Sequence, residues 1–79
     1  MIVKDITPYN DNGKRHGYWE YYHYNGNLVF KGNFVNGNKH GYWEEYHSNG
    51  NLYSKGNYVD GKEHGYWEEP CLNQINYYI

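Results

Sequence analysis

The chain has 79 residues, which is enough for one small domain and excludes a second. Its mean hydropathy of -1.17 is low, but 22% of its residues are Phe, Trp or Tyr, which separates it from disordered chains. Seven basic residues stand against nine acidic ones, for a formal net charge of -2. Binding driven by phosphate charge, to nucleic acid or to an anionic membrane, therefore has little electrostatic support.

The sequence carries no sign of secretion. Its single cysteine, Cys71, cannot close an internal disulfide, which excludes a disulfide scaffold and favours a reducing compartment. The first residues, Met1 to Tyr9, include Asp5 and Pro8 and form no uninterrupted apolar segment, and no stretch of the sequence is long enough to span a bilayer. We therefore expect a protein that works in the cytoplasm.

A pattern of 24 residues repeats along the chain. The string His-Gly-Tyr-Trp-Glu begins at His16, His40 and His64, and two Asn-Gly or Asp-Gly pairs recur in step with it. These pairs separate aromatic and β-branched segments of strand length, which is the sequence signature of β-hairpins. The predicted fold is all-β, a single-layer twisted antiparallel meander of tandem 24-residue hairpins, with helix disfavoured throughout.

In chain order, the repeat predicts a series of units and strands. We expect a degenerate N-terminal half-repeat at 1–11, repeats at about 12–35, 36–59 and 60–69, and a C-terminal cap at 70–79. The expected strands run over 17–24, 27–35, 41–48, 51–59 and 65–69. Together the units form one repeat domain over 1–79.

The two prolines mark the ends of this array. Pro8 lies at the Gly32 position of the half-repeat, and Pro70 interrupts the third unit where Tyr22 and Tyr46 stand in the others. Each proline removes a ladder donor near a sheet edge, where unpaired strands invite aggregation. The apolar tail after Pro70 either folds back as a cap or pairs with a second copy.

Two-residue turns at 25–26 and 49–50 would fix which tryptophan faces which glycine. Trp19 then falls opposite Gly32 and Trp43 opposite Gly56, so that each indole lies over a residue without a side chain. Trp67 is the equivalent residue of the third unit. We therefore assign all five residues a structural role.

The same register predicts ion pairs and two distinct faces. Glu20 meets Lys31 and Glu44 meets Lys55, and such pairs add about 0.2–1 kcal/mol each. The face assigned to the core carries Trp19, Leu28, Phe30, Phe34, Trp43, Leu52 and Tyr58. The opposite face, turned to solvent or a partner, carries Tyr18, Glu20, Tyr22, Val29, Lys31, Tyr42, Glu44, Tyr46, Tyr53 and Lys55.

The repeated motif resembles that of a known family. Gly-Tyr-Trp-Glu-x-Tyr-x-x-Asn-Gly-Asn-Leu, followed by Lys-Gly-Asn-(Phe/Tyr)-Val-(Asn/Asp)-Gly-(Asn/Lys), is similar to the MORN repeat, and specifically to the variant found in bacterial antitoxin-like proteins and giant viruses. The resemblance covers about 12–69. It implies an elongated sheet that acts as an interaction or scaffold module, in the host cytoplasm if the protein is viral. Members of the family have been connected with phospholipid contact, homodimerisation, partner binding and, in the variant branch, toxin neutralisation.

Five histidines raise the question of a metal site. His16, His40 and His64 each precede a strand glycine, His23 and His47 precede an Asn-Gly turn, and no His-x-x-His or Cys-x-x-Cys occurs in the sequence. This spacing favours structural roles, so we predict no metal and no cofactor.

Paired carboxylates give no catalytic site either. Glu44 and Glu45, like Glu68 and Glu69, are neighbours in a strand and point to opposite faces. The glycines are placed for turns, and none forms a phosphate loop between a strand and a helix. We therefore predict no catalytic residue and no enzymatic activity.

The tyrosine-rich face is the feature with functional promise, because exposed aromatic rings beside charges are typical of protein-binding surfaces. Ordinary cross-strand packing is the alternative interpretation. The candidate partner-binding residues are Tyr18, Tyr22, Tyr42, Tyr46, Tyr53 and Tyr66.

Our leading hypothesis is a non-enzymatic protein-interaction or scaffold module that binds a protein partner or a second copy of itself. Two alternatives come from the resemblance alone. The first is an antitoxin-type inhibitor that binds and neutralises a toxin, and the second is a peripheral phospholipid-binding module. The lack of a basic cluster disfavours lipid binding, and stacking on single-stranded nucleic acid would also need a basic groove.

Overall fold

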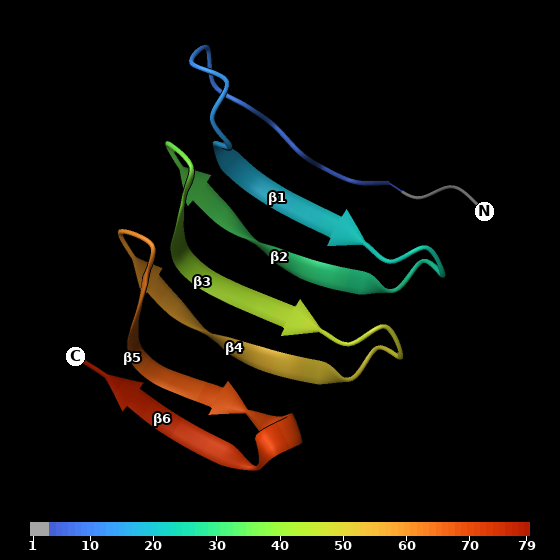
Figure 1. The fold of residues 1–79 in the computed structure, drawn as a ribbon, viewed down its shortest axis with the longest axis vertical. Coiled ribbons are helices and arrows are strands. Elements are labelled where there is room, and N and C mark those ends of the chain that lie inside the picture. Colours follow the sequence, from blue (N-terminus) through green and yellow to red (C-terminus); the bar gives the residue numbers. More distant parts are fainter. Residues whose placement is uncertain (1–3) are drawn as a thin grey trace.

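The sheet is all-β, as the repeat predicts. The computed structural model describes the backbone of residues 4–79 and every side chain in that range except that of Cys71. Its strands form one open antiparallel sheet in sequence order (Figure 1). They are β1 (Gly17–Tyr22), β2 (Leu28–Val35), β3 (Asn38–Tyr46), β4 (Leu52–Val59), β5 (Lys62–Glu69) and β6 (Gln74–Tyr78), with a 3₁₀ turn η1 (Pro70–Leu72) before β6.

The sheet is a single layer, and its aromatic rings serve as its core. The backbone measures 36 × 32 × 11 Å along its principal axes, and the strands twist visibly in Figure 1. Trp19, Phe34 and Trp43 are buried in one cluster, against which Phe30 and Tyr58 pack. We name this surface the tryptophan face, comprising Trp19, Phe30, Phe34, Trp43, Tyr58 and Trp67.

The predicted register of Trp19 against Gly32 and of Trp43 against Gly56 is confirmed, but the indole over each glycine is not the predicted one. A Cβ on Gly32 would lie 2.3 Å from the Trp43 ring, and one on Gly56 would lie 2.3 Å from the Trp67 ring. Because β2 and β4 have neighbours on both sides, each glycine is covered from the following unit.

Indole hydrogen bonds strengthen the same link between units. Trp43 Nε1 donates to the Asn33 carbonyl at 2.9 Å, and Trp67 Nε1 donates to the Asn57 carbonyl at 3.0 Å. Buried indoles need such an acceptor for their N–H group. Each tryptophan therefore fastens its own unit to the preceding one by packing and by a hydrogen bond.

The predicted ion pairs also change partner. Glu20 lies opposite Lys31 and Glu44 opposite Lys55 in the register. The Lys31 ammonium nevertheless pairs with Glu44 on β3 at 3.5 Å, and the Lys55 ammonium pairs with Glu68 on β5 at 3.9 Å. Each lysine lies on a strand between two strands that carry a glutamate. Its side chain reaches the glutamate of the following unit and not the one of its own hairpin.

The Asn-Gly signals form two kinds of turn. Asn36 and Gly37 both have positive φ, 49° and 87°, as do Asp60 and Gly61, 52° and 80°. These values are those of the two-residue type I′ turn. The turn ending at Gly26 is longer, because the Gly26 N–H bonds the His23 carbonyl at 2.8 Å.

This longer turn corrects the predicted strand ends. Tyr22 pairs with Leu28 across a bulge, and Tyr46 pairs with Leu52 in the same way. The prediction of a two-residue turn at 25–26 was therefore wrong, and the strands on both sides are shorter than predicted. Leu28 and Leu52 lie outside the cluster formed by Trp19, Phe34, Trp43, Phe30 and Tyr58.

Both ends of the described chain lie on the sheet. Near the start, Ile6 bridges to Glu20 and Tyr9 bridges to Arg15. At the other end, β5 stops at Glu69, Pro70 opens η1, and β6 pairs with β5 as an intramolecular cap. Within residues 4–79, no helix is long and apolar enough to cross a membrane.

Candidate functional site

The face opposite the tryptophans consists of tyrosines arranged around glutamates. We name it the tyrosine face, comprising Tyr18, Glu20, Tyr22, Tyr42, Glu44, Tyr46, Tyr53 and Tyr66. In the first unit, the Tyr18 and Tyr22 hydroxyls each donate to Glu20 at 2.6 Å. The arrangement follows from strand geometry, since residues two apart lie on the same face.

The second unit repeats this arrangement. The Tyr42 and Tyr46 hydroxyls donate to Glu44 at 2.8 and 2.5 Å. In the third unit Pro70 takes the place of the second tyrosine, and Glu68 keeps its hydrogen bond with Tyr66 and its ion pair with Lys55.

The hydrogen bonds fix the charge state of these groups. Hydrogen bonds from Tyr18 and Tyr22 lower the pKa of Glu20. Burial and the hydrogen bond to Glu20 raise the pKa of Tyr18 to about 12, while the hydrogen bond to Glu44 and burial raise that of Tyr46 to about 12. At neutral pH the glutamates are therefore charged acceptors and these tyrosines are neutral donors.

The structure thus places the predicted partner-binding tyrosines on one face, with most of their hydroxyls already bonded. The rings of Tyr18, Tyr42, Tyr53 and Tyr66 remain exposed, and those of Tyr22 and Tyr46 are half-buried. A partner could therefore contact ring faces but would compete with glutamate for the hydroxyls. Partner binding at these residues stays a prediction.

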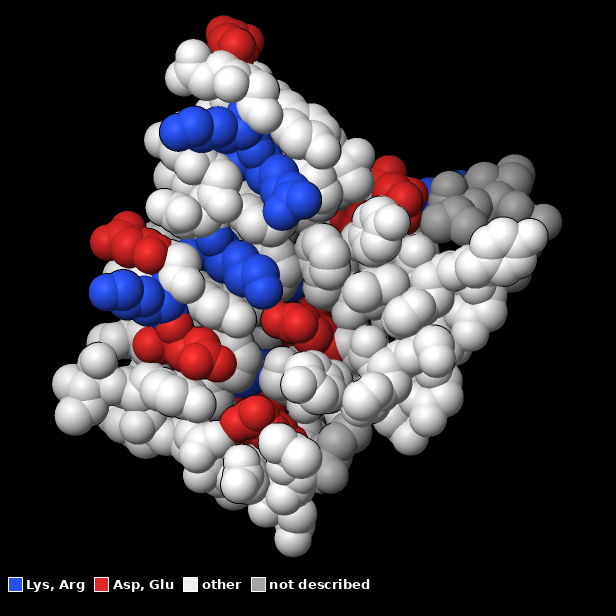
Figure 2. All heavy atoms as spheres, in the orientation of Figure 1, with Lys and Arg blue, Asp and Glu red and all other residues white. Residues whose placement is uncertain are grey.

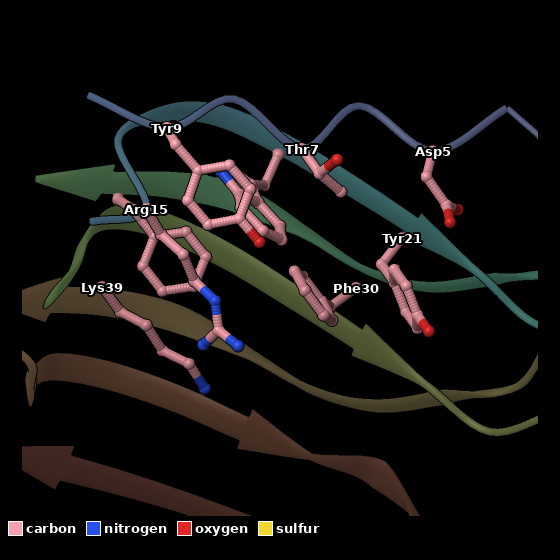
Figure 3. Close-up of a pocket in the computed structure, with 9 residues that line it drawn as sticks. Asp5, Thr7, Tyr9, Arg15, Tyr21, Phe30 and Lys39 are labelled. Atoms are coloured by element: carbon pink, nitrogen blue, oxygen red, sulfur yellow. The ribbon is translucent and has the colours of Figure 1, made fainter. Parts of the chain in front are cut away.

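A hollow of about 570 Å³ opens on the tryptophan face, between the N-terminal segment and the first strands (Figure 3). The rings of Tyr21 and Phe30 lie in its middle and stack on each other, with their centres 5.7 Å apart. The hollow is lined by Asp5, Thr7, Tyr9, Arg15, Trp19, Tyr21, Phe30, Phe34 and Lys39. The repeat pattern does not predict this hollow, because most of its lining comes from the degenerate half-repeat or from positions that differ between units, such as Arg15, Tyr21 and Phe30.

Two cations lie at one end of the hollow, and Asp5 lies at the other (Figure 3). The Arg15 guanidinium is 5.4 Å from the Trp19 ring centre and 5.5 Å from that of Phe34. No carboxylate among residues 4–79 lies within ion-pair distance of Arg15. An arginine stacked on aromatic rings can still offer its N–H groups to a ligand.

The second cation, the Lys39 ammonium, already interacts with two aromatic rings and a carboxylate. The Lys39 ammonium lies 4.9 Å from the Trp43 ring centre and 5.0 Å from that of Tyr58, and it pairs with Glu45 at 3.3 Å. At the far end, Asp5 is already occupied, since its carboxylate accepts the Tyr22 backbone N–H at 3.0 Å. That bond satisfies a donor beside the β-bulge at Tyr21 and Tyr22.

Residues 15–36 and 39–60 each match the family model described as MORN repeat variant. The chain belongs to this family. No curated protein and no solved structure matches the chain. The match establishes a repeat-protein module and agrees with the resemblance recognised in the sequence, while membership of an antitoxin-like branch stays a prediction.

The MORN units differ from one another at the positions around the hollow. One repeat position holds Arg15 in the first unit, Lys39 in the second and Glu63 in the third. Another holds Tyr21, then Glu45, then Glu69. Figure 2 shows basic side chains stepping across the first part of the sheet, with acidic ones between and below them. The charge on the tryptophan face therefore changes from positive to negative along the array.

Among the histidines, His16, His23 and His47 lie at turns or just outside strands, whereas His40 and His64 lie within β3 and β5 and pair with Asn33 and Asn57. His16 Nδ1 accepts the Asn36 backbone N–H at 3.1 Å, and the His47 ring packs edge-on against Tyr53. Nowhere in the described part of the chain do three or more His, Cys, Asp or Glu side chains gather in a way that could hold a metal ion.

Proposed function

We propose that this MORN protein is a non-enzymatic protein-interaction module, and that the hollow on the tryptophan face is its binding surface. The observation that carries the proposal is the state of the polar groups on the two faces. On the tyrosine face, tyrosine hydroxyls already donate hydrogen bonds to the glutamates of that face. Arg15, in contrast, lies beside an open aromatic hollow and has no ion-pair partner in residues 4–79.

The composition of the hollow supports binding over catalysis. Aromatic rings and an arginine are the side chains that dominate the energy of protein interfaces. Asp5 is the carboxylate that lines the hollow, and it already accepts a backbone N–H. A hydrolytic site requires a base hydrogen-bonded to a nucleophile, and among these lining residues Asp5 forms no such bond with the hydroxyl of Thr7 or Tyr9.

Photo-crosslinking in the native host tests both the module and its surface. A benzoylphenylalanine would replace one tyrosine at a time: Tyr21 in the hollow, Tyr42 on the tyrosine face, or Tyr24 at a hairpin tip as the exposed control. We expect a discrete protein adduct from position 21 and none from position 24. Adducts from position 42 alone would move the surface to the tyrosine face, and no adduct from either face would contradict the interaction module.

The other hypotheses are separated by the same adduct. An antitoxin-type inhibitor is an interaction module whose partner is a toxin, and mass spectrometry of the adduct would identify that partner. A peripheral phospholipid module would give no protein adduct and would float with anionic liposomes at low salt. We propose that the module works in the cytoplasm, consistent with its lone cysteine.

A further inference from the structure

We infer that the occupant of the hollow is an acidic, extended segment of a partner protein, held by Arg15 and Lys39 and confined to the first part of the tryptophan face. The inference rests on the proposed function, because it names the chemistry of the partner that the proposed surface binds. It combines the two cations at one end of the hollow, the aromatic floor beside them and the acidic residues that follow.

The cations give the charge of the partner. Arg15 keeps its planar side chain beside Trp19 and Phe34, and its guanidinium has no carboxylate partner in the described residues. This geometry presents a pre-oriented fork of N–H donors, which suits a carboxylate bound through two hydrogen bonds. Lys39 adds a second positive charge, although it divides its interaction between the ligand position and Glu45.

The floor of the hollow gives the order of side chains in the segment. Tyr21 and Phe30 lie next to the cations along the hollow, and Asp5 lies beyond them (Figure 3). A bound segment therefore needs an acidic side chain at the Arg15 end and an apolar side chain over the two rings. A second acidic side chain at the Asp5 end would be repelled, so the acidic and apolar side chains have one preferred order along the hollow.

The later units give the boundary of the bound segment. Glu45, Glu63 and Glu69 occupy the tryptophan face where the first unit carries Arg15 and Tyr21. Glu45 borders the hollow opposite Phe30 and is paired with Lys39, so Glu63 and Glu69 are the like charges that an acidic chain would meet beyond the hollow, and they oppose association. The change of sign along the repeats thus fixes the position of the partner as well as its charge.

Selection from a phage-displayed library of random short peptides tests the inference without knowledge of the partner. Purified wild-type protein should enrich peptides with Asp or Glu close to an apolar residue. Arg15→Glu should abolish that enrichment or shift it to basic peptides. Lys62→Glu is the matched control, because it makes the same kind of charge reversal outside the hollow and should select the wild-type peptides.

The outcomes separate the two proposals. Enrichment of neutral or basic peptides by the wild type would overturn the acidic partner and leave the interaction module standing. The same acidic peptides recovered with Arg15→Glu would show that they bind elsewhere, and would overturn the inference too. Failure of the wild type to enrich any peptide, together with no crosslinked protein, would overturn both.

Affinity measurements then assign the contacts and guard against a variant that fails to fold. Fluorescence anisotropy with the best selected peptide should show about tenfold weaker binding for Arg15→Gln, the size expected for one lost charge-assisted hydrogen bond. Arg15→Lys should recover part of that loss because it restores the charge without the fork. Circular dichroism must show the wild-type sheet in each variant, and unchanged affinity for Arg15→Gln would contradict the proposed contact.

Discussion

The two faces of this sheet use their aromatic residues in different ways. On the tryptophan face Trp43 and Trp67 each pack over a glycine of the preceding unit and donate to its backbone, as Trp43 does with Gly32 and Asn33. On the tyrosine face the aromatic residues bond within their own strand, as Tyr42 and Tyr46 do with Glu44. The tryptophans therefore join neighbouring units, while the tyrosines hold the charged glutamates in place.

The comparison also indicates where a repeat protein can acquire function. The groups that are identical in successive units, such as Trp43 and Trp67, have structural contacts that account for them. The side chains that differ, such as those of Arg15 and Glu63, lie on the same face but are not among the atoms that cover Gly32 and Gly56. Variation between units thus leaves the sheet intact and changes the charge that a partner meets.

The largest effect should come from breaking a link between units. Trp43→Ala removes the buried ring over Gly32 and its hydrogen bond, and should lower the free energy of unfolding by about 3–5 kcal/mol. Tyr42→Ala, the adjacent residue on the other face, loses an exposed ring and should cost about 1 kcal/mol or less. Urea unfolding followed by tryptophan fluorescence measures both, and equal losses would contradict the assignment of the core to the tryptophan face.

The next largest effect concerns two glycines that are required for different reasons. A Cβ on Gly32 would collide with the Trp43 ring, so Gly32→Ala should cost about 1–3 kcal/mol. Gly41 has open space around it but a φ of +78°, so Gly41→Ala should cost about 1–2 kcal/mol from backbone strain.

Removing the aromatic ring separates these two causes. In a Trp43→Leu background, Gly32→Ala should cost less than in the wild type, because the colliding ring atoms are absent. Gly41→Ala should cost the same in both backgrounds, since its strain does not depend on Trp43. Additive losses for Gly32→Ala in a double-mutant analysis would show that the indole is not what excludes a side chain there.

The tyrosine face predicts how stability depends on pH. Hydrogen bonds lower the pKa of Glu20 in the folded chain, so its contribution is present above the ordinary value of 4.5 and is lost as the pH falls through the lowered value. The pKa of Tyr18 and of Tyr46 is raised to about 12. Their contribution is present below the ordinary value of 10 and is lost between pH 10 and about 12.

Thermal melts across pH, with ultraviolet titration of the tyrosinates, measure these changes. Glu20→Gln should flatten the acid side of the stability profile and lower the alkaline midpoint of Tyr18 toward its ordinary value. Glu63→Gln, an exposed carboxylate on the tryptophan face, is the control and should change neither in this way. An acid limb as steep in Glu20→Gln as in the wild type would contradict the role given to Glu20.

The sequence predicted five strands, their order and most of the register, because the 24-residue repeat and the Asn-Gly pairs are local signals. It did not predict β6 as a strand, and it placed the starts of β3 and β5 at 41 and 65, three residues after Asn38 and Lys62, where they begin. It did not predict which of the two neighbouring strands supplies the contact to each side chain or glycine. Gly32 has a tryptophan on either side, and the register of one hairpin names Trp19, while the packing across the next strand boundary selects Trp43. A hairpin alignment contains no information about that second boundary.

The hollow was not predicted from the sequence, for a related reason. Its cation Arg15 belongs to a repeated unit, but Asp5 belongs to the half-repeat, whose bridges Ile6–Glu20 and Tyr9–Arg15 are offset from the register of the later units. The difference between Arg15, Lys39 and Glu63 at one repeat position was the available signal. It is visible in the sequence, but it points to a surface only once these residues are known to lie on the tryptophan face.

The smallest effect tests the choice of neighbour directly. In a double-mutant cycle on Lys31 and Glu44, changing each residue to Gln should give a coupling of about 0.2–1 kcal/mol, the usual range for an ion pair near the surface. The cycle on Lys31 and Glu20 should give a smaller coupling, since the Lys31 ammonium pairs with Glu44 and not with Glu20. Both couplings should weaken with added salt. If Glu20 coupled more strongly than Glu44, the lysine would belong to its own hairpin, and the charged residues would not join successive units as the tryptophans do.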